Sequence, residues 1–414
     1  MRISRFHMAF LLLLLLFCPN VAAQKPTKLD LLKVELCTLQ APEGYLDEFW
    51  QLCASPMNGE TIPIIHLGDS HVQGGYFSIP IRQFFDDYFG IGGLGWVAPY
   101  RFLRSNQPQP AKISGNKSGW LGSFITSRKY VDSPSPTGIT LTANGVSEVE
   151  ITATDYFPIK KLVVFRDASR PPLYIKGDSP SQRLLATSEE PTADTLSLSL
   201  PTSSLTLVAP KGARWYGASL ENDYPGPLLH TIGYNGAFYA TFNQHNFIEQ
   251  LHLLRPQLLI ISLGTNDMLV NRFSSDLLAS EVRSFVSALQ RTLPSTAIIL
   301  TSPISAYTTK RVRRRVYRWE VSRYAPDVAK TLEQVASSLG CGYIDLYSAF
   351  GGITKADALL DAGWLSKDRV HLTREGYDEA GKAIAYALLS DFRRYLERQR
   401  PLFYQDKTRK IGCD

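Results

Sequence analysis

The segment IIHLGDSHVQGG, residues 64–75, places a serine directly after a run of aliphatic residues and before a glycine turn. A strand that ends in this way presents the small polar residue at the rim of a sheet, where a ligand could reach it. A serine hydroxyl is protonated at neutral pH, so it attacks only with a general base, normally an imidazole that a carboxylate holds in the right tautomer. Ser70 is therefore a candidate nucleophile.

The best base and carboxylate for this serine lie near the end of the chain, in KDRVHLTREGYDEAG (residues 367–381). Asp368 and His371 are three residues apart, just before a pattern that predicts an amphipathic helix. At that spacing the carboxylate can accept the Nδ1–H of the imidazole and leave Nε2 free for the serine. His71 is a second imidazole beside Ser70. It could contact substrate or compete as base, although adjacent side chains in a tight turn usually point apart.

Acyl transfer also needs hydrogen-bond donors for the developing oxyanion, and two segments in the middle of the chain supply candidates. TIGYNGAFY (231–239) contains Gly236, whose backbone N–H can approach a ligand, and ISLGTNDM (261–268) contains Asn266 just after a predicted strand. With the backbone N–H of Ser70 these groups would form a three-donor oxyanion hole. Asp69 and Asp267 are interpreted as carboxylates that anchor their loops, and His66 as a core histidine.

Four short apolar runs predict the sheet that must position these residues. They are residues 62–69, 257–264, 296–303 and, more weakly, 342–347. Strands covered on both faces read as such runs, and helix-period stretches at 237–254, 275–292, 325–339 and 374–396 alternate with them. This alternation is typical of a doubly wound α/β fold, in which ligands bind at the carboxyl ends of the strands.

Residues 100–215 have a different texture, with alternating Thr, Ser and Val segments that predict an antiparallel β-sandwich inserted into the α/β domain. The predicted organisation is a signal peptide (1–23), an N-terminal helical segment (24–60), the first α/β part (61–99), the insert (100–215), the second α/β part (216–400) and a C-terminal tail (401–414). Trp96, Tyr100, Trp120, Trp215, Tyr216 and Tyr234 flank these segments, and one or two of them could form a wall on which sugars stack.

The N-terminus has two arginines, a leucine run and the small residues Val21-Ala22-Ala23, which predicts a secretory signal cleaved after Ala23 and hence a periplasmic or secreted protein. No later run approaches the roughly 20 apolar residues of a spanning helix, so stable membrane insertion is not expected. The mature cysteines Cys37, Cys53, Cys341 and Cys413 allow three pairings. Cys37 with Cys53 is the simplest, and free buried thiols are the alternative.

The net charge of +6 is concentrated in KRVRRRVYRW, residues 310–319. Its basic and aromatic residues could suggest nucleic acid, but export argues against that partner. A solvated helix entrance or loop is the simplest interpretation of residues 310–318, and contact with an anionic wall or surface polymer is the alternative. No spacing of ligands matches a metal site.

In order along the chain, Gly68-Asp69-Ser70, Gly236, Gly264-Thr265-Asn266-Asp267 and Asp368-Arg369-Val370-His371 resemble the four conserved blocks of the GDSL or SGNH hydrolase family. The resemblance implies a three-layer, flavodoxin-like α/β fold. It also implies Ser70 as nucleophile and first oxyanion donor, Gly236 and Asn266 as the other donors, His371 as base and Asp368 as its orienting partner. His71 departs from the family pattern, which has Leu there.

The inserted sandwich and the segments around it, such as GLGWVAPYR (93–101), look like the branch of these esterases that deacetylates peptidoglycan or other envelope polysaccharides. The resemblance therefore implies an exported serine esterase that acts on an O-acetylated glycan and needs no cofactor. Two alternatives stay open: a polysaccharide O-acetyltransferase with the same triad, and a non-catalytic carbohydrate-binding or envelope-assembly protein. The acyl chain, the sugar and the oligomeric state are not determined by the sequence.

Overall fold

The computed structural model describes residues 31–55, 60–127, 135–176, 192–222, 224–313 and 316–408. The described residues from Leu32 onward belong to one compact unit. The predicted signal peptide and Cys413 lie outside the described residues. None of the helices in the described part of the chain combines the length and the apolar character needed to cross a membrane.

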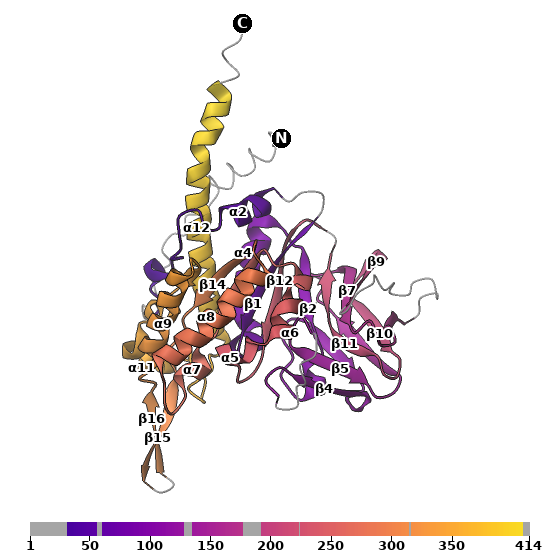
Figure 1. The fold of residues 1–414 in the computed structure, drawn as a ribbon, viewed down its shortest axis with the longest axis horizontal. Coiled ribbons are helices and arrows are strands. Elements are labelled where there is room, and N and C mark those ends of the chain that lie inside the picture. The colour runs from indigo at the N-terminus through magenta and orange to yellow at the C-terminus, as the bar shows by residue number, and fades with distance from the viewer. Residues whose placement is uncertain are drawn as a thin grey trace. The chain divides into compact units, whose positions relative to one another are not determined.

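Five parallel strands form the central sheet of the α/β part (Figure 1). Their spatial order is β12-β1-β13-β14-β17, which is 2-1-3-4-5 in chain order and therefore the flavodoxin-like arrangement. The strands are β1 (Thr61–Gly68), β12 (Gly226–Gly233), β13 (Leu258–Ser262), β14 (Ala297–Thr301) and β17 (Gly342–Ile344). The predicted parallel α/β sheet is confirmed, and β12 is an additional strand that the sequence pattern did not reveal.

Helices cover both faces of this sheet. On one side α8 (Ser275–Thr292) contacts α9 (Ala325–Ser338), and on the other α4 (Ile79–Phe89) contacts α12 (Arg374–Thr408). Alternate residues of β1 face opposite sides of the sheet. Ile65 and Leu67 belong to the hydrophobic cluster with α8 and α9, whereas the ring of His66 packs against Phe77, just before α4. The predicted helix at 237–254 is instead broken into α5 (Tyr239–Phe242), α6 (His245–Gln250) and a 3₁₀ turn (Leu251–Leu254).

The inserted segment forms two antiparallel sheets, as expected. One has the order β3-β6-β10-β8 and the other β4-β5-β11-β7-β9, with β2 paired to β11. The strands are β2 (Gly93–Val97), β3 (Lys112–Gly115), β4 (Trp120–Phe124), β5 (Ile139–Ala143), β6 (Ser147–Thr152), β7 (Ile159–Arg166), β8 (Tyr174–Ile175), β9 (Thr192–Thr202), β10 (Ser204–Ala209) and β11 (Arg214–Glu221). Because β2 and β11 belong to this layer, its strands extend beyond the predicted limits of 100 and 215.

The insert and the α/β part share one continuous hydrophobic cluster. They approach closely at Gly95 of β2, where a Cβ would lie 2.5 Å from the backbone oxygen of Leu229 in β12. One or two of six aromatic residues were expected to form a sugar-stacking wall, but all six lie in the core at no more than 5 % exposure: Trp96, Tyr100, Trp120, Trp215, Tyr216 and Tyr234. That expectation is therefore wrong, because these large side chains fill the hydrophobic cluster that the insert and the α/β part share.

The basic run is neither a loop nor a helix entrance. It forms a β-hairpin of β15 (Tyr307–Arg313) and β16 (Val316–Val321), which projects from the α/β part in Figure 1. The alternation of basic with aromatic or aliphatic residues in this run is the period-two pattern of a strand pair.

The described cysteines are free thiols. Cys37, Cys53 and Cys341 are buried and unpaired, so the predicted Cys37–Cys53 disulfide is wrong and the alternative of buried thiols holds for these three. Cys53 lies on the buried face of α2 (Asp47–Ala54), beside the aromatic core. Burial raises the pKa of Cys37 to about 12 and that of Cys341 to about 11, which keeps both thiols protonated and unreactive.

Candidate active site

Ser70 lies at the carboxyl end of β1, as the first residue of the short helix α3 (Ser70–Gln73). The turn requires glycine before it, since a Cβ on Gly68 would lie 2.3 Å from Cγ2 of Val72 and 2.6 Å from the backbone oxygen of Ser262. Asp69 caps the helix, its Oδ1 accepting the backbone N–H of His71 at 2.9 Å. A buried strand and a capped turn thus fix the serine at the sheet rim.

The structure brings Ser70, His371 and Asp368 into one hydrogen-bonded chain. Nε2 of His371 lies 2.8 Å from Oγ of Ser70, and its Nδ1 lies 2.8 Å from Oδ2 of Asp368. With the Nδ1–H donated to the carboxylate, Nε2 is the unprotonated nitrogen and accepts the serine O–H. This is the geometry in which an imidazole removes a proton from an attacking hydroxyl.

The carboxylate of Asp368 is held ionised by its neighbours. Partial burial acts to raise the pKa of Asp368, but hydrogen bonds from Ser366, from the His371 ring and from the backbone amides of Val370 and His371 outweigh it and hold the pKa well below the usual range. Three of these donors converge on Oδ1, at 2.6 Å from Ser366 Oγ and 2.9 Å from each backbone nitrogen. The other oxygen is therefore left for the imidazole, in a fixed orientation.

Gly236 and Asn266 lie on adjoining loops at the same end of the sheet. Gly236 has φ +74, and a Cβ there would meet nothing within 4 Å, so its backbone borders open space. Asn266 Nδ2 donates one hydrogen to the backbone oxygen of Ala237 at 2.9 Å and has a second hydrogen to offer. Asn266 thus fastens the backbone directly after Gly236.

Gln73 joins the serine helix to these loops, and no sequence motif pointed to this residue. Its side chain is 1 % exposed, with Oε1 accepting the backbone N–H of Asn235 at 2.8 Å. Its Nε2 donates to Ser105 Oγ at 2.7 Å and to the backbone oxygen of Asn106 at 3.1 Å, in the first loop of the insert. Gln73 thereby fixes the backbone next to Gly236 and ties the insert to the border of the site.

The remaining histidines and carboxylates near Ser70 have structural positions. Nδ1 of His71 lies 3.2 Å from the Tyr377 hydroxyl, and burial, with a smaller contribution from His371, lowers the pKa of His71 to about 3, so its ring is neutral. The ring of His66 is enclosed between Ser78 and Ser262, as expected of a core histidine. Burial raises the pKa of both Asp69 and Asp267 to about 7.

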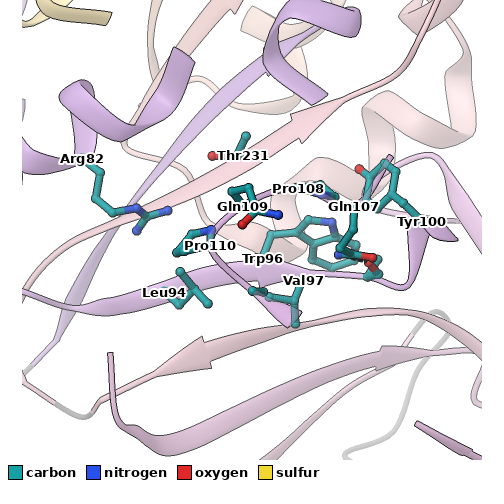
Figure 2. A pocket seen from close by; sticks show the side chains of 12 residues that line it. Arg82, Leu94, Trp96, Val97, Tyr100, Gln107, Pro108, Gln109, Pro110 and Thr231 are labelled. Atoms are coloured by element: carbon teal, nitrogen blue, oxygen red, sulfur yellow. Dashed lines mark hydrogen bonds between the residues drawn. The ribbon is translucent and has the colours of Figure 1, made fainter. Parts of the chain in front are cut away.

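The triad lies in an open part of the surface, with the side chains of His371 and Asp368 39 % and 54 % exposed. A separate pocket, drawn in Figure 2, lies at the junction of β2, α4 and the first loop of the insert, lined by Arg82, Trp96, Gln107, Gln109 and Pro110 among others. None of the triad or donor residues lines it. Within the described part of the chain, no group of three or more His, Cys, Asp or Glu side chains is arranged to hold a metal ion.

Comparison with known proteins agrees with this geometry. Residues 202–379 match the model of the GDSL-like lipase/acylhydrolase family. That range includes Gly236, Asn266, Asp368 and His371. It excludes Ser70, because the insert separates the serine segment from the rest. No curated protein matches the chain.

Solved structures with the same fold include that of a peptidoglycan O-acetylesterase, with a TM-score of 0.71, 21 % identity, and coverage of 86 % of this chain and 99 % of that one. Two weaker matches are a GDSL-like lipase from Bacteroides thetaiotaomicron (TM-score 0.30, 23 % identity, 40 % of this chain and 76 % of that one) and a carbohydrate esterase family 3 protein from Talaromyces cellulolyticus (TM-score 0.31, 15 % identity, 42 % of this chain and 76 % of that one). The first likeness spans both the α/β part and the insert and shows their common fold. The family match over residues 202–379 and the hydrogen-bonded Ser70, His371 and Asp368 confirm the predicted resemblance to the GDSL or SGNH hydrolases, which are carboxylic ester hydrolases.

Proposed function

We propose that this protein is an exported serine esterase that removes O-acetyl groups from a cell-envelope polysaccharide, with peptidoglycan as the first candidate. The observation that carries the proposal is the hydrogen-bonded chain from Ser70 through His371 to Asp368 at an open surface. An exposed triad suits an ester on a polymer, which cannot enter a closed tunnel. The fold shared with a peptidoglycan O-acetylesterase supports this substrate class.

The reaction proceeds in two acyl transfers. Ser70 Oγ attacks the acetyl carbonyl carbon while His371 Nε2 takes the hydroxyl proton, and Asp368 stabilises the imidazolium. The oxyanion receives hydrogen bonds from the backbone N–H groups of Ser70 and Gly236 and from Nδ2 of Asn266. The bond from carbon to the sugar oxygen then breaks, and His371 returns the proton to that oxygen. Water, deprotonated by His371, attacks the acetyl-serine, and acetate leaves as Ser70 recovers its proton.

Export is the second part of the proposal. Its support is the N-terminal sequence, with two arginines, a leucine run and Val21-Ala22-Ala23 before Gln24. Intact-mass measurement of the protein recovered from a secretory host would show a chain that begins at Gln24, with or without loss of ammonia as this residue cyclises. A mature protein that retains Met1 would contradict the cleavage.

The decisive assay measures acetate released from p-nitrophenyl acetate and from O-acetylated peptidoglycan. We expect Ser70→Ala and His371→Ala to lower kcat/KM by about 10⁴-fold or more, because each removes a reacting group. His245→Ala, which removes an exposed histidine on α6, is the matched control and should retain activity. Unchanged turnover in either triad variant would end the proposal. Transfer of labelled acetyl to an added oligosaccharide in preference to water would identify an O-acetyltransferase instead.

A further inference from the structure

The hairpin β15–β16 carries two unlike faces. Before the register shift near its tip, Tyr307 pairs with Val321, Thr309 with Trp319 and Arg311 with Tyr317, and paired residues at alternate positions share one face. We call this set the stacking face. Lys310 and Arg318 lie on the opposite face, where both form ion pairs with Glu320.

The aromatic residues of the stacking face become more exposed toward the tip. Tyr307 is buried at the base, Trp319 is 41 % exposed and Tyr317 is 62 % exposed. Arg311, beside Tyr317, is exposed and forms no ion pair with any residue that the structure describes. The stacking face therefore offers two accessible rings and a cation that no described residue neutralises, over about 7 Å of strand.

The base of the stacking face is joined to the loop that carries the catalytic base. Arg369, between Asp368 and His371, places its guanidinium over the rings of Tyr307 and Trp319, at 5.4 and 5.5 Å from their centroids. The backbone N–H of Tyr307 donates to the backbone oxygen of Arg369 at 2.9 Å. A polymer on the stacking face would thus reach the triad loop without crossing another element.

We propose that the stacking face of the β15–β16 hairpin binds a carboxylate-bearing polysaccharide strand and guides its ester groups to Ser70; this inference rests on the proposed function. Sugar rings stack on Trp319 and Tyr317, and carboxylates pair with the guanidinium groups of Arg311 and Arg369. Single-stranded nucleic acid also favours rings beside cations, but it contains no carboxylic ester for the adjoining triad to cleave. The position of the hairpin beside an esterase triad therefore favours an acylated anionic glycan.

The first test compares substrates in the double variant Arg311→Gln/Tyr317→Ser. We expect the ratio of kcat/KM on O-acetylated peptidoglycan to kcat/KM on p-nitrophenyl acetate to fall at least about fivefold, through KM. The ratio for neutral acetylated xylan should fall less. Lys330→Gln/Tyr386→Ser removes one exposed cation and one exposed ring from α9 and α12 and serves as the matched control. Thermal melts confirm that each variant is folded.

The second test measures binding without turnover. Ser70→Ala protein is pelleted with insoluble peptidoglycan, with and without the two hairpin substitutions, and the substitutions should weaken retention about fivefold and reduce its sensitivity to salt. Suppose that the parent hydrolyses esters but the hairpin substitutions change neither retention nor the rate ratio. That result would overturn the role of the hairpin and leave the proposed function standing. Equally tight binding to single-stranded DNA or to anionic lipid vesicles would also overturn that role, since the surface would then recognise charge in general. Absence of any ester hydrolysis by the parent would overturn the proposed function.

Discussion

Replacing Asp368 by Asn should impair catalysis more than replacing it by Ala. Three donors, the Ser366 hydroxyl and the backbone amides of Val370 and His371, converge on one carboxylate oxygen. In Asp368→Asn the amide oxygen must take that position, because the amide nitrogen would face two N–H groups there. The NH₂ group then points at Nδ1 of His371 and donates to it, so the ring proton moves to Nε2, the nitrogen that must accept the proton of Ser70.

The magnitude follows from these contacts. The wrong tautomer lowers kcat by about 10⁴-fold in an Asn variant of another serine hydrolase, and we expect a loss of that order here. In Asp368→Ala no amide opposes the Nδ1–H, and because His371 is 39 % exposed, water can accept that hydrogen. The Ala variant should therefore retain about tenfold more activity than the Asn variant, a difference of about 1.4 kcal/mol that matches one hydrogen bond.

The assay is kcat/KM on p-nitrophenyl acetate, with thermal melts to show that the loop still folds without its carboxylate. Since the pKa of Asp368 is held well below its ordinary value, the wild-type rate should show no protonation of this group above pH 5. An Asn variant as active as the Ala variant, or more active, would refute the argument that backbone donors fix the orientation of the side chain.

Three further predictions follow from the site and the core. Asn266→Ala should lower kcat about 10²- to 10³-fold with little change in KM, because its free amide hydrogen serves the oxyanion, and an equal rise in KM would contradict that role. Gln73→Ala should lower kcat about tenfold by releasing the backbone beside Gly236, while Gln73→Glu, which can still accept the Asn235 N–H, should recover part of the loss. Burial lowers the pKa of His66 to about 3. The contribution of its neutral ring to the free energy of unfolding is therefore fully present above about pH 6.5 and is lost as the pH falls. In denaturant titrations from pH 7 to 4, the free energy of unfolding should therefore fall more steeply in the wild type than in His66→Gln, by up to about 1.4 kcal/mol per pH unit. Parallel curves for the two proteins would contradict burial of the ring.

The insert shows where sequence texture is informative and where it is not. Alternating Thr, Ser and Val residues predicted antiparallel strands because such a pattern fits a half-buried sheet. The aromatic residues of the same region gave no indication of which side they face, and Trp120 and Trp215 fill the core rather than a sugar site. The β15–β16 hairpin was not predicted, because the interpretation relied on the many charged residues of this run. Its structure depends instead on the period of two with which residue types alternate.

The sequence by itself determined the chemistry and the class of fold. Buried parallel strands read as apolar runs, and the spacing of Asp368 and His371 is short enough to impose their contact locally. The tertiary structure alone decided that Ser70 meets a histidine 301 positions away, that Gln73 holds the loop of Gly236, and that the hairpin adjoins the triad loop. The physical reason is that periodicity and spacing act over a few residues, while contacts between distant segments depend on strand order and on which faces pack together.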